Sequence, residues 1–416
     1  MEKKKHNETE KNKKRVKKTS IEKTEAWRIA EFDYAGIIAQ GMIPLLSAPL
    51  TGPEKIEQLK EILKDCPEFY PALLEVGYRS IKEGKDKAGK RFIDKGLQSL
   101  KMHFSKKDLI TAYYDTGSFL EDHFRFEMAI EYYNELEKIE KNKAEVYDYL
   151  SYCYVYLDDL DKAFEFQQKA IELCDSNNKF FCNMGWVELL RGNVDAAKTM
   201  LEKSLKLNPK DEVTKGNYEI CKIMQKNKRL KNWEMFLLER IDYEYLEKLE
   251  DEDMTEYQRQ IMIDNRNKLD AFKFDLLRNP RYTPTERYDI WFTLGYILNF
   301  IGGVCDESVF SYDDMATVEC YFKSIMHKFI VKTGDIDEEI FNDVYTSLLE
   351  FYKFLAKRKV ISQYKSMKNE MLKLKPELME KMFRYNEIRH NDEYTKEEKA
   401  EIRGELFEGD DWWPFL

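Results

Sequence analysis

One pattern repeats three times between residues 110 and 211, at a constant offset of 34 residues and with no gap between copies. Each copy carries a small residue and, twelve positions later, an alanine: Gly117 and Ala129, Ser151 and Ala163, and Gly185 and Ala197. A period of this length is typical of a helix–turn–helix unit that cannot bury its apolar face alone and stacks on copies of itself. We therefore expect paired antiparallel helices, with the small residues where two helices approach closely.

The third copy, residues 178–211, carries the fullest motif. Its aromatic, apolar, small and closing residues are Phe181, Met184, Gly185, Ala197, Leu201, Ser204 and Pro209. In these residues the stretch resembles the tetratricopeptide repeat family. Two positions depart from that pattern: Glu188 stands where the family prefers tyrosine, and Asp175 replaces the closing proline of the second copy. The resemblance implies an all-α fold, a right-handed superhelical solenoid of antiparallel helix pairs.

The pattern extends in both directions from the three clear copies. A fourth copy is indicated upstream by Leu73, Gly77 and Gly89, but its spacing to the next copy is 40 residues. We expect the six additional residues to form a longer turn around residues 103–107. Downstream, residues 212–228 have the pattern of a solvating cap helix. The predicted solenoid spans residues 70–228, preceded by helices or a divergent repeat at 24–69.

The rest of the chain resembles no family by its motifs. Residues 229–391 are predicted to form a helical C-terminal domain, with helices that include 337–357, 362–374 and 376–388, the last two divided by Pro376. Residues 392–416 are an acidic tail that ends in the sequence DDWWPFL. The C-terminal half either continues the solenoid or forms a separate bundle. Continuation or close docking is favoured, because no flexible linker separates the halves.

Charge and cysteine use limit the classes of function. The net charge of −10 disfavours a dedicated duplex-DNA binder. Residues 1–23 nevertheless carry ten Lys or Arg against four Glu. We expect a disordered basic tail, which can make weak nucleic-acid contacts through phosphates. The seven cysteines contain no C-x-x-C pair, and no segment has the pattern of a membrane span. A reduced, cytoplasmic protein is expected.

A search for catalytic motifs finds none with a specific signal. The sequence lacks a Walker A loop, G-x-G-x-x-G, G-x-S-x-G and H-E-x-x-H. Glu387 and His390 have the spacing of one half of a helical di-iron site, but the other half is missing. No cofactor, metal site or catalytic residue is therefore predicted.

The resemblance implies a binding surface instead. In this family the concave face is lined by the first helix of each repeat. Carried over by repeat position, its residues are Thr111, Tyr114, Ser118 and Glu121 in the first copy, Glu145, Asp148, Tyr152 and Val155 in the second, and Lys179, Cys182, Trp186 and Leu189 in the third. Tyr114 and Ser118 replace the lysine and asparagine that grip chaperone carboxylates in some members. A protein partner with an apolar anchor beside basic residues is expected.

Two alternatives stay open at this point. Trp186 and Tyr152 either line an open groove or pack beneath the C-terminal half. The expected function is a non-catalytic protein–protein interaction scaffold or adaptor. An RNA- or ribosome-associated factor that uses the basic arm is the alternative, and an enzyme hosted by the C-terminal helices is less favoured. Partner identity and oligomeric state do not follow from these patterns.

Overall fold

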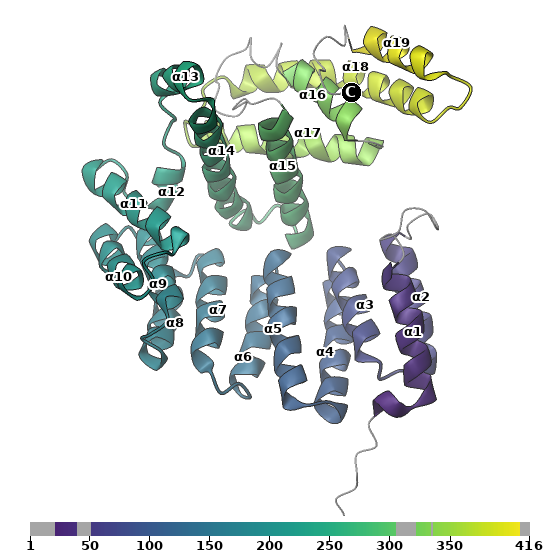
Figure 1. Ribbon diagram of the computed structural model, residues 1–416, viewed down its shortest axis with the longest axis vertical. Coiled ribbons are helices and arrows are strands. Elements are labelled where there is room, and N and C mark those ends of the chain that lie inside the picture. The colour runs from purple at the N-terminus through teal and green to yellow at the C-terminus, as the bar shows by residue number, and fades with distance from the viewer. Residues whose placement is uncertain (1–20, 40–50, 305–321, 334–335, 408–416) are drawn as a thin grey trace, which may run out of the picture. The chain divides into compact units, whose positions relative to one another are not determined.

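The computed structural model describes residues 21–39, 51–304, 322–333 and 336–407, and every element in these ranges is a helix. The predicted all-α repeat fold is confirmed (Figure 1). The chain divides into two compact units, Met1–Val146 and Tyr147–Leu416. No helix in the described part of the chain combines the length and apolar character that crossing a bilayer requires. Most of the basic arm, residues 1–20, and the DDWWPFL segment lie outside the described ranges.

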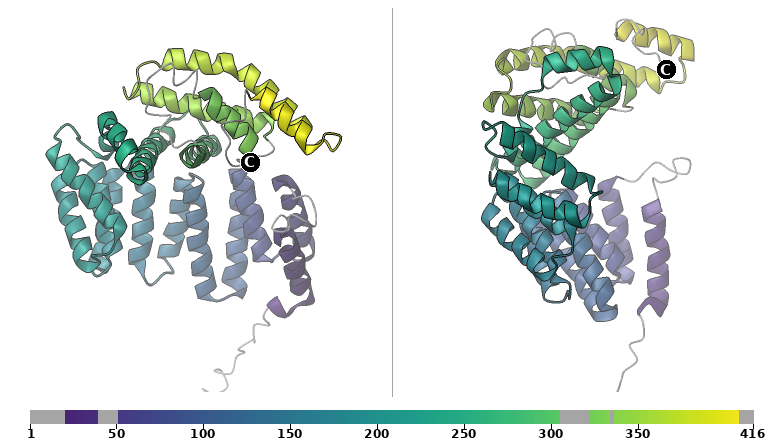
Figure 2. Two further views of the ribbon diagram at one scale, coloured as in Figure 1. Left: turned by 45° about the horizontal axis from the view of Figure 1, so that its top comes forward. Right: turned by 60° about the vertical axis from the view of Figure 1, so that its left-hand side comes forward.

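The first unit consists of antiparallel helices that lie side by side (Figure 2). They are the short 3-10 helix η1 (Ile21–Lys23), α1 (Glu25–Ala39), α2 (Gly52–Asp65), α3 (Tyr70–Lys82), α4 (Asp86–His103), α5 (Lys106–Asp122) and α6 (Phe126–Glu137). At its N-terminal end, one core joins Trp27 of α1, Leu59 of α2 and Phe69 at the start of α3.

The second unit contains the later repeat helices together with the C-terminal helices. The repeat part comprises α7 (Lys143–Tyr156), whose first turn belongs to the first unit, α8 (Leu160–Leu173), α9 (Asn178–Leu190), α10 (Val194–Leu207) and α11 (Glu212–Lys226). The C-terminal part comprises α12 (Trp233–Leu237), α13 (Tyr243–Glu252), α14 (Met254–Leu277), α15 (Pro284–Val304), α16 (Lys323–Lys332), α17 (Glu338–Lys357), α18 (Tyr364–Arg389) and α19 (Lys396–Leu406).

The small residues of the repeat lie where paired helices are closest, as predicted. A Cβ atom on Gly185 of α9 would lie 2.6 Å from Cγ of Leu201 in α10, and one on Gly117 would collide with the ring of Tyr133. In the second copy, Ser151 Oγ donates a hydrogen bond of 2.7 Å to the backbone carbonyl of Ala163. A larger side chain at these positions would force the helices apart.

The six additional residues of the upstream copy extend the helix α4 and do not lengthen the turn after it, so the predicted longer turn is wrong. α4 has 18 residues whereas α6 has 12, and only Phe104 and Ser105 separate α4 from α5. Ser105 starts α5 early through a capping box, in which its Oγ accepts from the amide of Asp108 and its amide donates to the Asp108 carboxylate. The first 12 residues of α4 match the length of α6, so residues 98–103 are the extension of α4.

A single helix, α18, also replaces the two that Pro376 was expected to divide. Proline in a helix interior removes one hydrogen bond, here to the carbonyl of Leu372. Both Pro376 and Leu372 are exposed, so water can hydrate that carbonyl. Buried residues on both sides of the proline, including Met371 and Leu378, hold the helix to the C-terminal core.

That core lies among the C-terminal helices. Its largest fully buried side chains are aromatic and include Phe329, Phe341 and Phe351. α17 packs against α15 on one side and α18 on another (Figure 2). The two predicted capping boxes are present, with Thr283 and Glu286 starting α15 and Thr395 and Glu398 starting α19.

Candidate protein-binding surface

Three aromatic rings come together on the first helices of the second and third repeats. Tyr152 and Tyr156 lie one turn apart on α7, with ring centres 4.8 Å apart. Trp186 of α9 lies 6.2 Å from Tyr152 and 6.1 Å from Tyr156. All three side chains are half-buried. Tyr152 and Trp186 were predicted from the sequence as binding residues. Tyr156 was not, although it lies one helical turn beyond Tyr152 on the same face. We call these three residues the aromatic triad.

The end of α14 packs against the aromatic triad. Phe274 stacks on Tyr156 with ring centres 5.3 Å apart, and it shares a core cluster with Val155, Val187 and the partly buried Trp186. Lys273 places its ammonium 4.2 Å from the ring centre of Tyr156, within cation–π distance. One edge of the triad is therefore covered by the chain itself, as the second of the two sequence alternatives expected, while the rings keep partial exposure.

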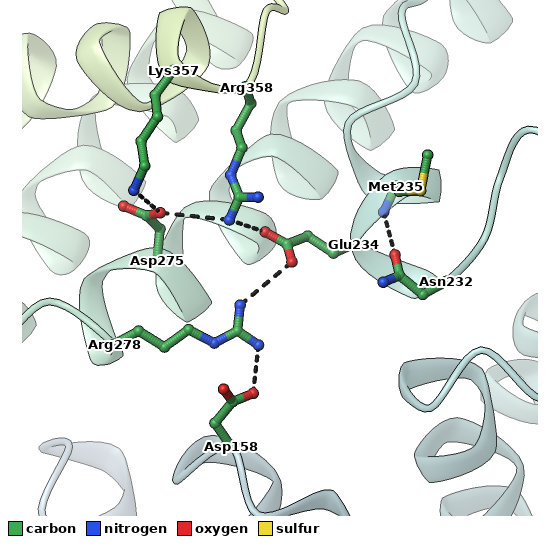
Figure 3. A network of polar contacts seen from close by, with 8 residues as sticks. All are labelled: Asp158, Asn232, Glu234, Met235, Asp275, Arg278, Lys357 and Arg358. Carbon is green, nitrogen blue, oxygen red and sulfur yellow. Dashed lines mark hydrogen bonds and ion pairs between the residues drawn. The ribbon is translucent and has the colours of Figure 1, made fainter.

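A network of ion pairs fixes this end of α14 (Figure 3). Arg278 donates to Asp158, in the turn between α7 and α8, at 2.6 Å and to Glu234 of α12 at 3.4 Å. Glu234 also pairs with Arg358, which lies 3.5 Å from Asp275 of α14. Three C-terminal helices are thus tied to the turn that follows the triad helix. Most of these side chains are partly exposed, so each pair contributes little by itself.

Asp148, predicted to face the groove, is committed to the interior of the stack. Its side chain is 3% exposed, and Oδ1 accepts hydrogen bonds from Gln167 of α8 at 2.9 Å and from Asn183 of α9 at 2.7 Å. Lys179 pairs with Oδ2 at 2.8 Å. The carboxylate therefore joins three helices of neighbouring repeats.

Four further predicted residues are interior in this structure. Val155 belongs to the core cluster with Phe274, and Cys182 and Leu189 belong to a cluster formed by α9, α10 and α11. Burial raises the pKa of the Cys182 thiol. Glu121 is 9% exposed. The positions carried over from the family therefore include packing residues, and the binding proposal below does not use these four.

The remaining predicted residues are more accessible. Tyr114, Ser118 and Glu145 are partly exposed, and Thr111 is exposed. Nearby in the first unit, the structure reveals a second aromatic contact that was not predicted. Tyr78 of α3 stacks on Phe119 of α5 at 4.3 Å, and its hydroxyl lies 2.9 Å from Thr116 Oγ1. Because Phe119 directly follows Ser118, it lies next to the predicted position.

The described residues show no arrangement typical of a metal centre. No group of three or more His, Cys, Asp or Glu side chains in these ranges is placed to hold a metal ion. The feature that stands out is the group of half-buried aromatic rings, a residue type that is enriched at surfaces that bind proteins.

Comparisons with known proteins agree with this repeat architecture. The tetratricopeptide repeat family model matches residues 144–177 and 179–211. The BBSome complex member BBS4 of Bos taurus is 31% identical over 83 residues, which are 20% of this chain and 16% of that protein. The chain thus matches less than a fifth of that relative's length.

Two solved structures are also similar to parts of this chain. YrrB, described as a TPR protein with an unusual peptide-binding site, matches with a TM-score of 0.33 and 16% identity, over 51% of this chain and 96% of that chain. PilF of Pseudomonas aeruginosa matches with a TM-score of 0.33 and 14% identity, over 56% of this chain and 96% of that chain. From the family match and the helix pairs together, residues 144–211 of this chain are tetratricopeptide repeats.

Proposed function

We propose that the chain is a non-catalytic, cytoplasmic scaffold or adaptor that binds a protein partner on the first helices of its repeats. The observation that supports this proposal is the aromatic triad: three rings from two successive repeats gather on one surface and stay partly exposed. Aromatic side chains of this kind supply much of the binding energy at protein interfaces.

The triad favours a partner with an apolar anchor. An apolar side chain inserted beside Trp186 and Tyr152 would remove aromatic surface from water without breaking a hydrogen bond that holds the stack. The preference for basic residues on the partner now rests on Glu145, at the start of α7, because Glu121 and Asp148 are buried. Basic residues near the anchor would affect the rate of encounter more than the final affinity.

Replacing Trp186 tests the proposal. A partner is first captured by the tagged full chain and identified by mass spectrometry, and its dissociation is then followed by surface plasmon resonance. Trp186→Ala should weaken binding by about 2 kcal/mol, or roughly 30-fold, mainly through faster dissociation. Phe292→Ala is the matched control, because Phe292 is an exposed aromatic residue of α15, outside the triad.

Thermal unfolding of each variant is measured alongside, since Trp186 also contributes to packing. A folded Trp186→Ala protein that binds and releases the partner at wild-type rates would exclude the triad as the binding surface.

A further inference from the structure

A groove of about 940 Å³ lies on the first unit, on the second helices of two neighbouring repeats. It is lined by Lys90, Asp94, Leu97, Gln98, Lys101 and Met102 of α4, by Tyr113 of α5, and by Glu131, Tyr132, Asn134 and Glu135 of α6. The α4 residues recur every three or four positions, so they form one face of that helix. At 1.5 Å per residue, this face is roughly 18 Å long.

The groove depends on the extension of α4. Gln98, Lys101 and Met102 belong to the residues by which α4 exceeds α6. In a repeat of ordinary length these positions would fall in the turn. The 40-residue spacing in the sequence therefore provides three of the six α4 residues that line the groove.

One end of the groove has its charges already paired. Lys90 lies 3.4 Å from the carboxylate of Asp94 and 3.2 Å from that of Glu131. Tyr132 donates its hydroxyl proton to Asp94 Oδ1 at 2.9 Å. Burial and the neighbouring Asp94 carboxylate raise the pKa of Tyr132, which keeps this donor protonated. A basic ligand would have to displace Lys90 from both carboxylates.

The other end presents a cation and apolar surface. Lys101 is exposed and forms no ion pair with any residue that the structure describes. Met102 beside it is 42% exposed, and Leu97 and the half-buried ring of Tyr113 continue the apolar surface. The remaining acid at the rim, Glu135, is paired with Lys138 at 2.5 Å. Among the charged residues that line the groove, Lys101 is therefore the one without an ion-pair partner in the described part of the chain, while at the other end two carboxylates share Lys90.

We propose that this groove is a second docking site, for a short peptide segment of a partner protein in which an acidic residue adjoins aromatic residues. The carboxylate would meet Lys101, and an aromatic side chain would lie against Met102, Leu97 and Tyr113. The length of the groove suits five or six residues of extended chain at about 3.3 Å each. The site goes beyond the proposed function, because it lies mainly on the second helices of the repeats, with Tyr113 as its one lining residue from a first helix.

A peptide with the required chemistry is available for a direct test. The sequence DDWWPFL, which forms residues 410–416 of this chain, places two acids before three aromatic residues. We would titrate the full-length protein into a fluorescein-labelled DDWWPFL peptide and follow fluorescence anisotropy. Binding should weaken with added salt, and the NNWWPFL peptide should bind less tightly and with a smaller salt dependence, because its side-chain charges are removed.

Charge reversal and removal of the apolar surface test the groove itself. Lys101→Glu and Met102→Asp should each weaken peptide binding at least about fivefold, as expected for loss of a charge contact or an apolar contact at an interface. Lys95→Glu is the matched control, because Lys95 is an exposed lysine of the same helix that does not line the groove. Circular dichroism verifies that each variant is folded.

Three outcomes would overturn the proposal. They are no binding of DDWWPFL by the wild type up to about 1 mM, equal binding by the wild type and both groove variants, and loss of peptide binding in Trp186→Ala with binding retained in Lys101→Glu. The last outcome would assign the peptide to the first-helix surface. Wild-type affinity in Trp186→Ala, together with weak binding by Lys101→Glu, supports the groove whether or not the aromatic triad binds another partner.

Discussion

The side chain of Asp148 lies where the repeat pattern places a groove residue, yet it stabilises the stack. We predict that Asp148→Ala lowers the free energy of unfolding by about 3 kcal/mol, since it removes the acceptor shared by the buried amide of Gln167, which keeps only the Phe180 carbonyl, and the half-buried amide of Asn183. Urea denaturation measures the change. Asp161→Ala, at an exposed acid of the neighbouring helix, is the control. An unfolding midpoint for Asp148→Ala within error of the control would contradict the structural role.

His123 predicts a pH dependence of stability. Its pKa is lowered in the folded protein, first by burial and then by the positive charges of Lys82 and Arg125, against the backbone carbonyl of Phe119, which raises it. Because the folded state disfavours the protonated ring, stability is complete above the unfolded pKa of about 6.5 and is lost as the pH falls below it.

This pH effect is tested by replacing the histidine. Urea midpoints at about pH 7.5 and pH 5.5 are compared for the wild type and His123→Asn, which has no titrating ring. The wild type should lose more stability than the variant over this interval. An equal loss in both proteins would show that other groups cause the pH dependence.

Among the helices, α18 contains a proline, Pro376, in its interior, and the helix continues on both sides of it. We predict that Pro376→Ala raises the free energy of unfolding by about 1 kcal/mol or more, because alanine restores the hydrogen bond to the carbonyl of Leu372 and removes the clash of the ring. Thermal denaturation followed by circular dichroism measures the gain. Lys373→Ala, an exposed substitution in the same helix, should have a smaller effect. A destabilised Pro376→Ala protein would indicate that the fold requires the proline.

Sequence patterns predicted the helices well where local signals were specific. The capping box of Thr283 and Glu286 and the close approach at Gly185 follow from short-range chemistry, and both are present. The extension of α4 could not be predicted in the same way, since residues 98–103 are compatible with a helix and with a turn. Tertiary packing decides between them.

The candidate binding surface was less predictable than the helices. Repeat position identifies which helix face a residue occupies, but neighbouring helices determine whether it is exposed. Asp148 is buried because Gln167 and Asn183 approach it from two other helices. The rings of Tyr156 and Phe274 meet although more than one hundred residues separate them. No local pattern encodes such a contact.

At the level of the second unit, the end of α14 is one of the places where the C-terminal helices pack against the repeats. Phe274 contributes apolar contact with Tyr156, while Arg278 joins Asp158 and Glu234 (Figure 3). The apolar contact is buried and the ion pairs are partly exposed. The apolar packing should therefore provide most of the free energy that holds the end of α14 in place. The ion pairs should mainly determine its orientation.

Reversing the charge of Arg278 tests this division of roles. Arg278→Glu places a third acid beside Asp158 and Glu234, so the end of α14 should open more often although the cores on both sides remain intact. Hydrogen–deuterium exchange should accelerate in α12, in the last turns of α14 and in the α7–α8 turn, and stay unchanged in the core of α17. Arg281→Glu, at a more exposed arginine 3.9 Å from Glu350, is the control and should leave all of these segments unchanged. Faster exchange throughout the second unit would show instead that the ion pairs support its global stability, and unchanged exchange would show that Phe274 holds the helix end alone.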